Sequence, residues 1–332
     1  MTEPGPPREH WYLAAGSADL GARPLAVRLL GEPLVLFRGA DGRPRALLDR
    51  CAHRNLALSR GRVVKGDLEC AYHGWRYGSG GACVAIPSLC GPLPRIAVPA
   101  CPALEADGFV WVYAGREAPA HGPRPFPHLR QKGWTTFVMR NRFQAGPLAC
   151  LENFLDCPHT AYVHRGWFRT TRSREVPARV SVGADEVRVE FDERPERDSV
   201  VGRLLFPKGR ALVHTDRFLM PATSRVDYRF GPDWHFIITS QCTPVDEDTT
   251  DVTTVVTFHA GRIGWLVRAY FEPLCRRIIR QDLDLLKAQT GDIARFGSRR
   301  FTSVASDLVG PQIERLWKKP AAPEAREVVL RF

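Results

Sequence analysis

The chain of 332 residues is 44% hydrophobic and 25% charged, which suits two globular domains and excludes a disordered or low-complexity chain. No apolar run approaches the roughly 18 residues of a membrane-spanning helix. The net charge is +11, but the 47 basic residues are spread along the chain without a run of five or six, which does not favour nucleic-acid binding.

Short strand-like runs dominate the first third of the chain. They lie at residues 27–30, 33–37, 45–48 and 108–113. Asp41-Gly42, between the second run and the third, is typical of a β-hairpin turn. These runs predict an antiparallel β-domain over residues 1–118, with two loops at its tip that carry paired Cys and His residues.

Those two loops hold the most informative residues of the chain. Cys51 and His53 form one pair, and Cys70 and His73 form the other. Two thiolates and two imidazoles in mixed pairs suit a [2Fe-2S] cluster with one cysteine-ligated and one histidine-ligated iron, whose reduction potential exceeds that of an all-cysteine cluster. A Cys2His2 zinc site uses the same residue types, but its usual spacing pairs Cys with Cys and His with His.

The two-loop motif resembles that of Rieske proteins. Respiratory members carry an extra cysteine in each loop and join the two in a disulfide, whereas Leu56 and Tyr72 stand at the corresponding positions here. The resemblance therefore implies the ferredoxin and oxygenase branch. Ala52 and Asn55 replace a frequent Pro and a frequent Gly of oxygenase loops. Asn tolerates a positive φ better than most residues, so we expect the loop to keep its turn.

A proline-rich segment, 119–127, is typical of a linker, and it precedes a second domain over residues 128–332. Strand-like runs and two helical segments follow. The strand-like runs are 135–139, 187–191, 235–240 and 251–258, and the helical segments are 146–165 and 263–296. We expect an α+β domain in which helices pack against one face of a sheet.

A second candidate metal site lies in the first helical segment. His159 and His164 lie about 140° apart around an ideal helix, so they can bind one metal only if the helix is broken. Pro158 predicts that break, because its ring clashes with the carbonyl four residues earlier and it lacks an N–H. Asp156 would lie near His159. A pair of buried structural histidines is the alternative.

The long helical segment contains the candidate for a third ligand. Asp282 has apolar residues three and four positions away on both sides, so it faces inward, whereas Asp284 lies on a largely polar face. A buried carboxylate without a partner is costly, and a metal ion removes that cost. We therefore expect Asp282, rather than Asp284, to be the ligand.

The order of these features resembles Rieske non-haem iron oxygenases over essentially the whole chain. The resemblance implies an N-terminal all-β Rieske domain, then a helix-grip (START-like) catalytic domain with an antiparallel sheet and a long C-terminal helix. It implies that His159, His164 and Asp282 bind a mononuclear Fe(II) that activates O2. The spacing is similar to the monooxygenase and demethylase group, which includes vanillate demethylase-like and steroid-hydroxylase-like enzymes.

The resemblance implies a separate catalytic role for Asp156. In the family, the corresponding aspartate links an iron-bound histidine to a Rieske histidine of the neighbouring subunit. Here it would link His159 to His73 across an interface, which implies a homotrimer. A helix cap is the alternative, since Asp before Pro also suits a helix start.

The implied activity is a Rieske-type monooxygenase, an oxidoreductase that hydroxylates or oxidatively dealkylates a small organic substrate. The chain has no Gly-rich dinucleotide fingerprint, so an NAD(P)H-dependent reductase or a ferredoxin would supply electrons. A positive face that docks an acidic redox partner is one interpretation of the charge. A cis-dihydroxylating dioxygenase and an electron-transfer protein without catalysis remain as alternatives.

The expected location is the reducing cytoplasm. The nine cysteines are an odd number with no disulfide framework, and the N-terminal residues show no signal-peptide core. We expect no membrane or nucleic-acid partner.

Aromatic residues of the second domain suggest an apolar substrate pocket, although such residues also suit a core. They are Trp167, Phe168, Phe218, Phe230, Trp234 and Phe236. The other histidines have no ligand spacing, but His214 and His235 lie in strand-like runs and could face the pocket.

Overall fold

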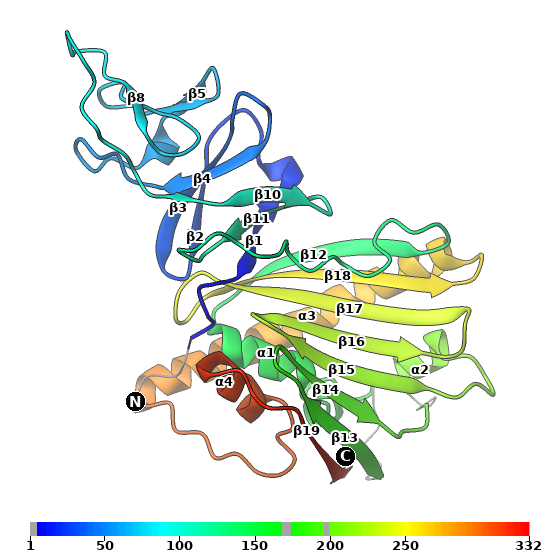
Figure 1. Ribbon diagram of the computed structural model, residues 1–332. Helices are drawn as coiled ribbons and strands as arrows, with labels where there is room; N and C mark the ends of the chain where they lie inside the picture. The colour runs from blue at the N-terminus through cyan, green and yellow to red at the C-terminus, as the bar shows by residue number, and fades with distance from the viewer. Residues whose placement is uncertain (1–4, 168–173, 196–198, 332) are drawn as a thin grey trace. The chain divides into compact units, whose positions relative to one another are not determined.

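The computed structural model describes residues 5–167, 174–195 and 199–331 (Figure 1). The chain forms two compact units. The first contains Pro7–Pro125 and Thr243–Asp246, and the second contains, among the described residues, 5–6, Phe126–Cys242 and 247–331. The predicted domain limits, 1–118 and 128–332, stay a prediction. The two units are defined by contacts between residues, and such units do not have to coincide with domains.

The first unit is built from antiparallel strands. Their bounds are β1 Trp11–Gly16, β2 Leu25–Leu29, β3 Glu32–Arg38, β4 Pro44–Leu48, β5 Arg62–Val64, β6 Asp67–Glu69, β7 Arg76–Tyr77, β8 Cys83–Ala85, β9 Ala100–Cys101, β10 Ala103–Ala106 and β11 Phe109–Tyr113. One sheet has the order β1-β11-β10, and two others have the orders β2-β3-β4-β9 and β5-β6-β7-β8. The hairpin predicted at Asp41-Gly42 joins β3 to β4, with Gly42 at a φ of 74°. The loop of Cys51 follows β4, and the loop of Cys70 joins β6 to β7.

The second unit contains one eight-stranded antiparallel sheet (Figure 1). Its strands are β12 Thr135–Phe143, β13 Glu175–Val182, β14 Glu186–Phe191, β15 Val213–Leu219, β16 Thr223–Arg229, β17 Trp234–Pro244, β18 Thr250–Ala260 and β19 Glu324–Arg331. Their order is β12-β18-β17-β16-β15-β14-β13-β19. The sequence pattern predicts only β12, β14, β17 and β18. Charged residues interrupt the apolar runs of the other four; along β19, for example, Leu330 is the one buried residue.

The helices of the second unit are α1 Pro147–Leu155, α2 Val200–Leu205, α3 Gly264–Phe296 and α4 Gly310–Lys318. The predicted helix over 263–296 is confirmed as α3. The predicted helix over 146–165 is wrong in its second half, because α1 ends at Leu155 and Asp156 is extended, with φ −85° and ψ 100°. A continued helix would place the Pro158 ring against the carbonyl of Phe154, so the chain leaves the helix and forms a short 3-10 turn at Pro158–Ala161.

The core of the second unit lies between α3 and the sheet. Phe137 of β12 and Phe258 of β18 each contact Phe271 of α3 edge-on, with 6.0 Å between ring centroids. Residues of α1 and α3 line one cavity together with the sheet, so both helices cover the same face. The expected α+β class, with an all-β first part and an antiparallel sheet under a long helix, is confirmed.

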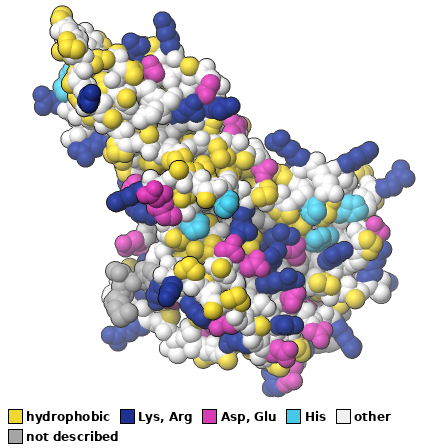
Figure 2. All heavy atoms as spheres, in the orientation of Figure 1, with side chains coloured by type: hydrophobic (Ala, Val, Ile, Leu, Met, Phe, Trp, Pro, Cys, Tyr) yellow, Lys and Arg dark blue, Asp and Glu magenta, His cyan; other side chains and the backbone are white. Residues whose placement is uncertain are grey.

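None of the described helices has the length and apolar character needed to cross a membrane. On the face drawn in Figure 2, Lys and Arg side chains are dispersed among Asp and Glu rather than gathered in one patch. The surface on that face thus matches the scatter of basic residues along the sequence.

Candidate functional site

The loop of Cys51 closes through two backbone hydrogen bonds. The Cys51 N–H donates to the carbonyl of Leu56 at 2.9 Å, and the Asn55 N–H donates to the carbonyl of Cys51 at 3.0 Å. Asn55 has a φ of 61°, which confirms that it can replace the frequent glycine. Its side-chain oxygen accepts a hydrogen bond from Arg50 Nε at 2.8 Å, which holds the turn from outside.

The loop of Cys70 repeats the same turn. The Cys70 N–H donates to the carbonyl of Trp75 at 2.8 Å, and the Gly74 N–H donates to the carbonyl of Cys70 at 3.0 Å. Gly74 has a φ of 70°, as Asn55 has in the first loop. Two copies of one turn therefore present Cys51 with His53, and Cys70 with His73, in matching positions.

The four side chains divide by burial. Cys51 and Cys70 are both buried, whereas His53 is half-buried and His73 is exposed. The two imidazole centroids are 4.5 Å apart, and His53 stacks on Trp75 at 4.6 Å with an interplanar angle of 4°. His53 Nδ1 is buried without a hydrogen-bond partner, as expected of a nitrogen that binds a metal.

This arrangement fits a two-iron cluster better than one zinc ion. Four ligands of a single tetrahedral ion must converge on one point. The ligand atoms of Cys51, His53, Cys70 and His73 do not converge in this way: among the described residues, one other group of His, Cys, Asp or Glu side chains brings three or more ligand atoms within 4.8 Å of one another. Buried thiols and outward imidazoles instead suit one iron held by cysteines and one held by histidines.

Tyr77 is a cluster neighbour that the sequence analysis does not identify. Its hydroxyl oxygen lies 3.2 Å from Cys51 Sγ and accepts a hydrogen bond from the Ala52 N–H at 3.1 Å. The Tyr77 proton is thus free to donate to the sulfur. Burial and then the adjacent Cys51 raise the pKa of Tyr77, so the hydroxyl stays a donor.

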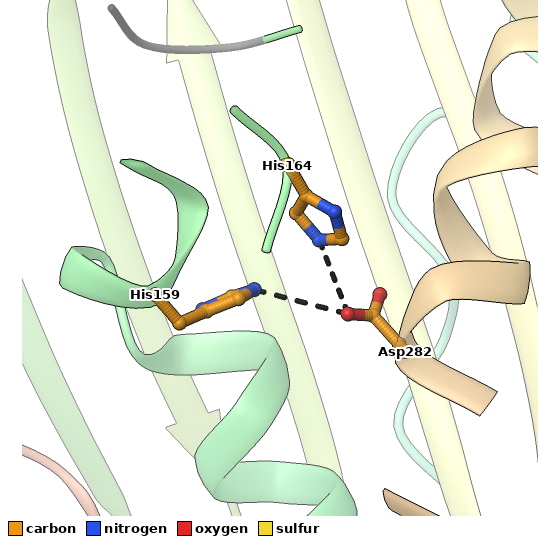
Figure 3. Close-up of side chains that lie close together, drawn as sticks. All are labelled: His159, His164 and Asp282. Carbon is orange, nitrogen blue, oxygen red and sulfur yellow. Dashed lines mark ion pairs between the residues drawn. The ribbon is translucent and has the colours of Figure 1, made fainter. Parts of the chain in front are cut away.

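The group with converging ligand atoms is His159, His164 and Asp282 (Figure 3). Asp282 Oδ1 lies 3.9 Å from His159 Nε2 and 3.1 Å from His164 Nε2. His159 lies in the 3-10 turn after α1, His164 lies shortly beyond it, and Asp282 lies on α3. The break at Pro158 thus allows the two histidines to converge, as predicted.

Hydrogen bonds orient both imidazoles toward the carboxylate. His164 Nδ1 donates to the amide oxygen of Gln281 at 2.9 Å, and His159 Nδ1 donates to the backbone carbonyl of Asp156. Each ring therefore turns its Nε2 toward Asp282. His159 Nε2 and Asp282 Oδ1 are both buried without hydrogen-bond partners.

Three acceptor atoms that face one another inside a protein need a cation between them. Two imidazole nitrogens and one carboxylate form the facial set that binds non-haem Fe(II) and leaves coordination positions open. The residues present therefore fit a mononuclear iron.

The choice between two aspartates agrees with the burial of α3. Asp282 is 4% exposed and Asp284 is exposed, as the periodicity predicts. Burial alone would lower the pKa of His164, but the adjacent Asp282 and Gln281 outweigh burial and raise it. One detail of the expected apolar stripe is wrong, since Leu285 is 41% exposed.

Asp156 lies at the end of α1 with its carboxylate 3.9 Å from His159 Nδ1. The N-cap position of the following 3-10 turn is Cys157, and no side-chain cap bond is made there. The backbone N–H of His159 nevertheless interacts with the Asp156 carboxylate, so the helix-cap alternative for Asp156 stays a prediction. Its side chain is 45% exposed, so it can also contact a group outside this chain.

A cavity of about 170 Å³ adjoins the triad, between the sheet and α3. Its wall is mainly apolar, as is usual for sites that bind small organic molecules. The apolar lining includes Met139, Phe154, Val226, Phe236, Ile238, Val256, Phe271, Ile278 and Ile279.

Of the aromatic residues expected around a pocket, Phe236 lines this cavity. Trp167 and Trp234 pack against the core cluster instead, and Phe218 and Phe230 are fully buried elsewhere. Phe168 lies outside the described residues.

His214 does not line the cavity but lies beside the lining residue Tyr228 on the same face of the sheet. Its ring stacks between Phe191 and Tyr228, at 4.5 Å and 4.4 Å between centroids. Its Nδ1 lies 2.7 Å from the carboxylate of Glu193, which lines the cavity, and its Nε2 lies 3.0 Å from Asp216. His235 does not line the cavity; it pairs with Asp227 at 3.0 Å.

Both parts of the chain match known families. The Rieske [2Fe-2S] domain matches residues 10–98, and the vanillate O-demethylase oxygenase C-terminal domain matches residues 143–321. The oxygenase component of dicamba O-demethylase from Stenotrophomonas maltophilia is 32% identical over 66% of this chain and 62% of its own length. The 4beta-methylsterol monooxygenase of Methylococcus capsulatus is 33% identical over 61% of this chain and 56% of its own.

Solved structures show the same fold. Pseudomonas putida CBB5 NdmA with caffeine has a TM-score of 0.77 at 23% identity, and the match covers 94% of this chain and 90% of that one. Dicamba monooxygenase bound to 3,6-dichlorosalicylic acid has a TM-score of 0.77 at 24% identity, covering 94% and 97%.

The matched segments span between a quarter and two thirds of the curated relatives; for chlorophyllide a oxygenase of Chlamydomonas reinhardtii, 38% identical, the share is 26%. The vanillate O-demethylase oxygenase domain nevertheless covers more than half of this chain. A Rieske domain joined to an oxygenase domain implies a [2Fe-2S] cluster and a mononuclear iron centre that uses O2. The chain belongs to the Rieske oxygenases whose catalytic domain is of the vanillate O-demethylase type.

Proposed function

We propose that the protein is a Rieske non-haem iron monooxygenase that hydroxylates, or oxidatively dealkylates, a small organic substrate. The observation that carries this proposal is the buried convergence of His159, His164 and Asp282 beside an apolar cavity. An electron-transfer protein needs neither the second metal set nor a cavity next to it. The names of similar proteins, among them a demethylase and a sterol monooxygenase, support the same reaction class.

The overall reaction converts R–H, O2, two electrons and two protons into R–OH and water. Cys51, His53, Cys70 and His73 would hold the cluster that carries the electrons, and the triad would hold the iron, which supplies O2 activation when bound. Gln281 orients His164, and the backbone of Asp156 orients His159. The apolar wall excludes water from the reacting carbon.

The electrons would come from a separate NAD(P)H-dependent reductase or a ferredoxin, because the sequence holds no dinucleotide fingerprint. None of the nine cysteines forms a disulfide, which supports work in the reducing cytoplasm. Asp156 and His73 are both exposed on their own units. This exposure supports a homotrimer in which Asp156 contacts His73 of the next subunit, so that electrons pass between subunits.

The decisive experiment replaces the third ligand. In Asp282→Ala we expect the mononuclear iron to be lost and O2-dependent product formation to fall to background, while the visible spectrum of the cluster stays unchanged. Asp284→Ala, an exposed neighbour on the same helix, is the matched control and should keep both metals. Normal iron content in Asp282→Ala would contradict the proposal.

Isotope labelling separates the two oxygenase reactions. With ¹⁸O2, a monooxygenase places one labelled atom in the product and the other in water. A cis-dihydroxylating dioxygenase places both labelled atoms in the product.

A further inference from the structure

The sheet wall of the cavity changes from apolar to polar along its strands. Side chains that line the cavity alternate along β16 and β17, and Val226 lies opposite Ile238. The next inward pair in the direction of α1 is Ser224 opposite Ser240. Thr254 of the adjacent strand β18 also lines the cavity, next to Ser240.

We call Ser224, Ser240 and Thr254 the hydroxyl row. Their exposed fractions are 2%, 4% and 2%, so no part of the row lies at the protein surface. The same sheet buries other hydroxyls, among them those of Thr239 and Thr257, but the three of the row differ in lining the cavity, where a ligand can reach them. Three hydroxyls in register on neighbouring strands therefore indicate a binding role.

The row has unused hydrogen-bonding capacity. Ser240 Oγ and Thr254 Oγ1 are 2.9 Å apart, and across the described ranges each is the other's one hydrogen-bond partner. One of the two donates its proton, so the other keeps an O–H to donate, and both keep lone pairs. A buried donor without a partner is costly, and a ligand acceptor in the cavity would remove that cost.

The charges of the cavity decide which ligand group fits. Apart from the triad, the charged side chains on its described wall are Glu193, which is buried, and Arg194, which is exposed. No buried cationic side chain lines the described wall, since the neighbouring His214 lies outside it and is held by Glu193 and Asp216, so a substrate carboxylate at the row would be desolvated without a cationic side chain as partner. A neutral oxygen avoids that penalty and still accepts the free O–H.

We propose that the hydroxyl row binds a neutral carbonyl or hydroxyl oxygen of the substrate, while its apolar body packs against the remaining wall. The substrate class is therefore a neutral, largely apolar molecule with an oxygen-bearing group. The row is a positioning device, because a hydrogen bond at one end of the cavity selects which carbon faces the triad. This inference rests on the proposed function, since it takes the cavity as the substrate site.

The test compares three probes of similar shape: acetophenone, α-methylstyrene and benzoate. They place a carbonyl, an apolar methylidene group and a carboxylate on the same ring. Binding is measured by calorimetry on the iron-loaded protein without O2 or reductant, so the result does not depend on turnover. We expect wild type to bind acetophenone more tightly than either other probe.

Substitutions test whether the hydroxyl row causes the preference for acetophenone. In Ser240→Ala and Thr254→Val we expect acetophenone binding to weaken about two- to tenfold, which one neutral hydrogen bond supplies, while α-methylstyrene binding is retained. Thr254→Ser should restore the preference. Thr253→Val, the next residue on β18 with its side chain on the other face, is the matched control.

Three outcomes would overturn the inference: an unchanged ratio between acetophenone and α-methylstyrene in the row variants, tighter binding of benzoate than acetophenone by wild type, and no preference for acetophenone in wild type. Failure of the proposed function is a separate result, because it appears as normal iron content in Asp282→Ala. The two failures are therefore distinguishable.

Discussion

The two proposed metal sites are built in opposite ways. The cluster loops repeat one turn, in which a cysteine carbonyl accepts a hydrogen bond from the residue four positions later. The triad instead joins a broken helix end to α3, and its orienting bond from His164 to Gln281 spans 117 residues. The geometry of the cluster loops is therefore set by short stretches of chain, whereas the geometry of the triad forms only after sheet and helices have packed. Mutations can test this contrast.

The largest expected effect concerns the buried charges around His214, beside the cavity. Burial alone would lower the pKa of His214, but Asp216 and Glu193 outweigh burial and raise it to about 9. Because this value lies above the ordinary 6.5, the imidazolium stabilises the fold fully below about pH 6.5, and the stabilisation is lost as the pH rises through about 9. It amounts to about 3 kcal/mol.

Urea unfolding at pH 6.5 and pH 9.5 measures this loss. The free energy of unfolding should decrease with pH in wild type and much less in His214→Gln. His259→Gln, which changes a histidine that bonds a backbone carbonyl, should retain the wild-type dependence. Parallel pH profiles for wild type and His214→Gln would show that the charge network does not stabilise the fold.

The second effect concerns the orientation of the triad. In Gln281→Leu, His164 loses the acceptor of its Nδ1–H. We expect the affinity for mononuclear iron to fall about 10- to 100-fold, the usual cost of removing such a partner. Competition with a chelator measures it, and the cluster spectrum should not change. The exposed Gln289, changed to Leu, is the control; equal iron affinities in the two variants would exclude an orienting role.

The third effect concerns the local turn of the first cluster loop. Asn55 has a φ of 61°, where a β-branched side chain is strained by about 1–3 kcal/mol. We expect Asn55→Val to hold less cluster than wild type, as absorbance per protein reports, while its mononuclear iron is retained. Asn55→Gly should load normally, because Gly74 performs the same task in the second loop. Full loading of Asn55→Val would show that the turn is set from outside the loop.

The smallest effect concerns the hydrogen bond to the cluster sulfur. Tyr77→Phe removes the donor to Cys51 Sγ, and a hydrogen bond of about 0.5–1.5 kcal/mol corresponds to a fall of roughly 20–65 mV in the reduction potential. Potentiometry with spectroscopic detection measures it. Tyr113→Phe, whose hydroxyl bonds Glu9 instead, should leave the potential unchanged. An unchanged potential in Tyr77→Phe would mean that the sulfur does not accept this bond.

Much of the second unit could not be predicted from the sequence. The long helix is visible because its apolar residues recur over many turns. Charged residues occupy three of the seven positions of β16 and four of the eight positions of β19, so the conformation of these strands depends on pairing with neighbours rather than on their own pattern. The aromatic residues mislead for a related reason: their type indicates burial, but only the strand register decides which of them lines the cavity.

The sequence by itself determined the ligand types, their order along the chain and the inward face of Asp282, because spacing and helical periodicity are local properties. It also determined that the helix must break near Pro158. Only the tertiary structure decided that Gln281 orients His164, that Tyr77 reaches Cys51, and that a row of hydroxyls lies on the cavity wall. These contacts join residues far apart in the chain, and their geometry follows from strand register and helix packing, which no local pattern records.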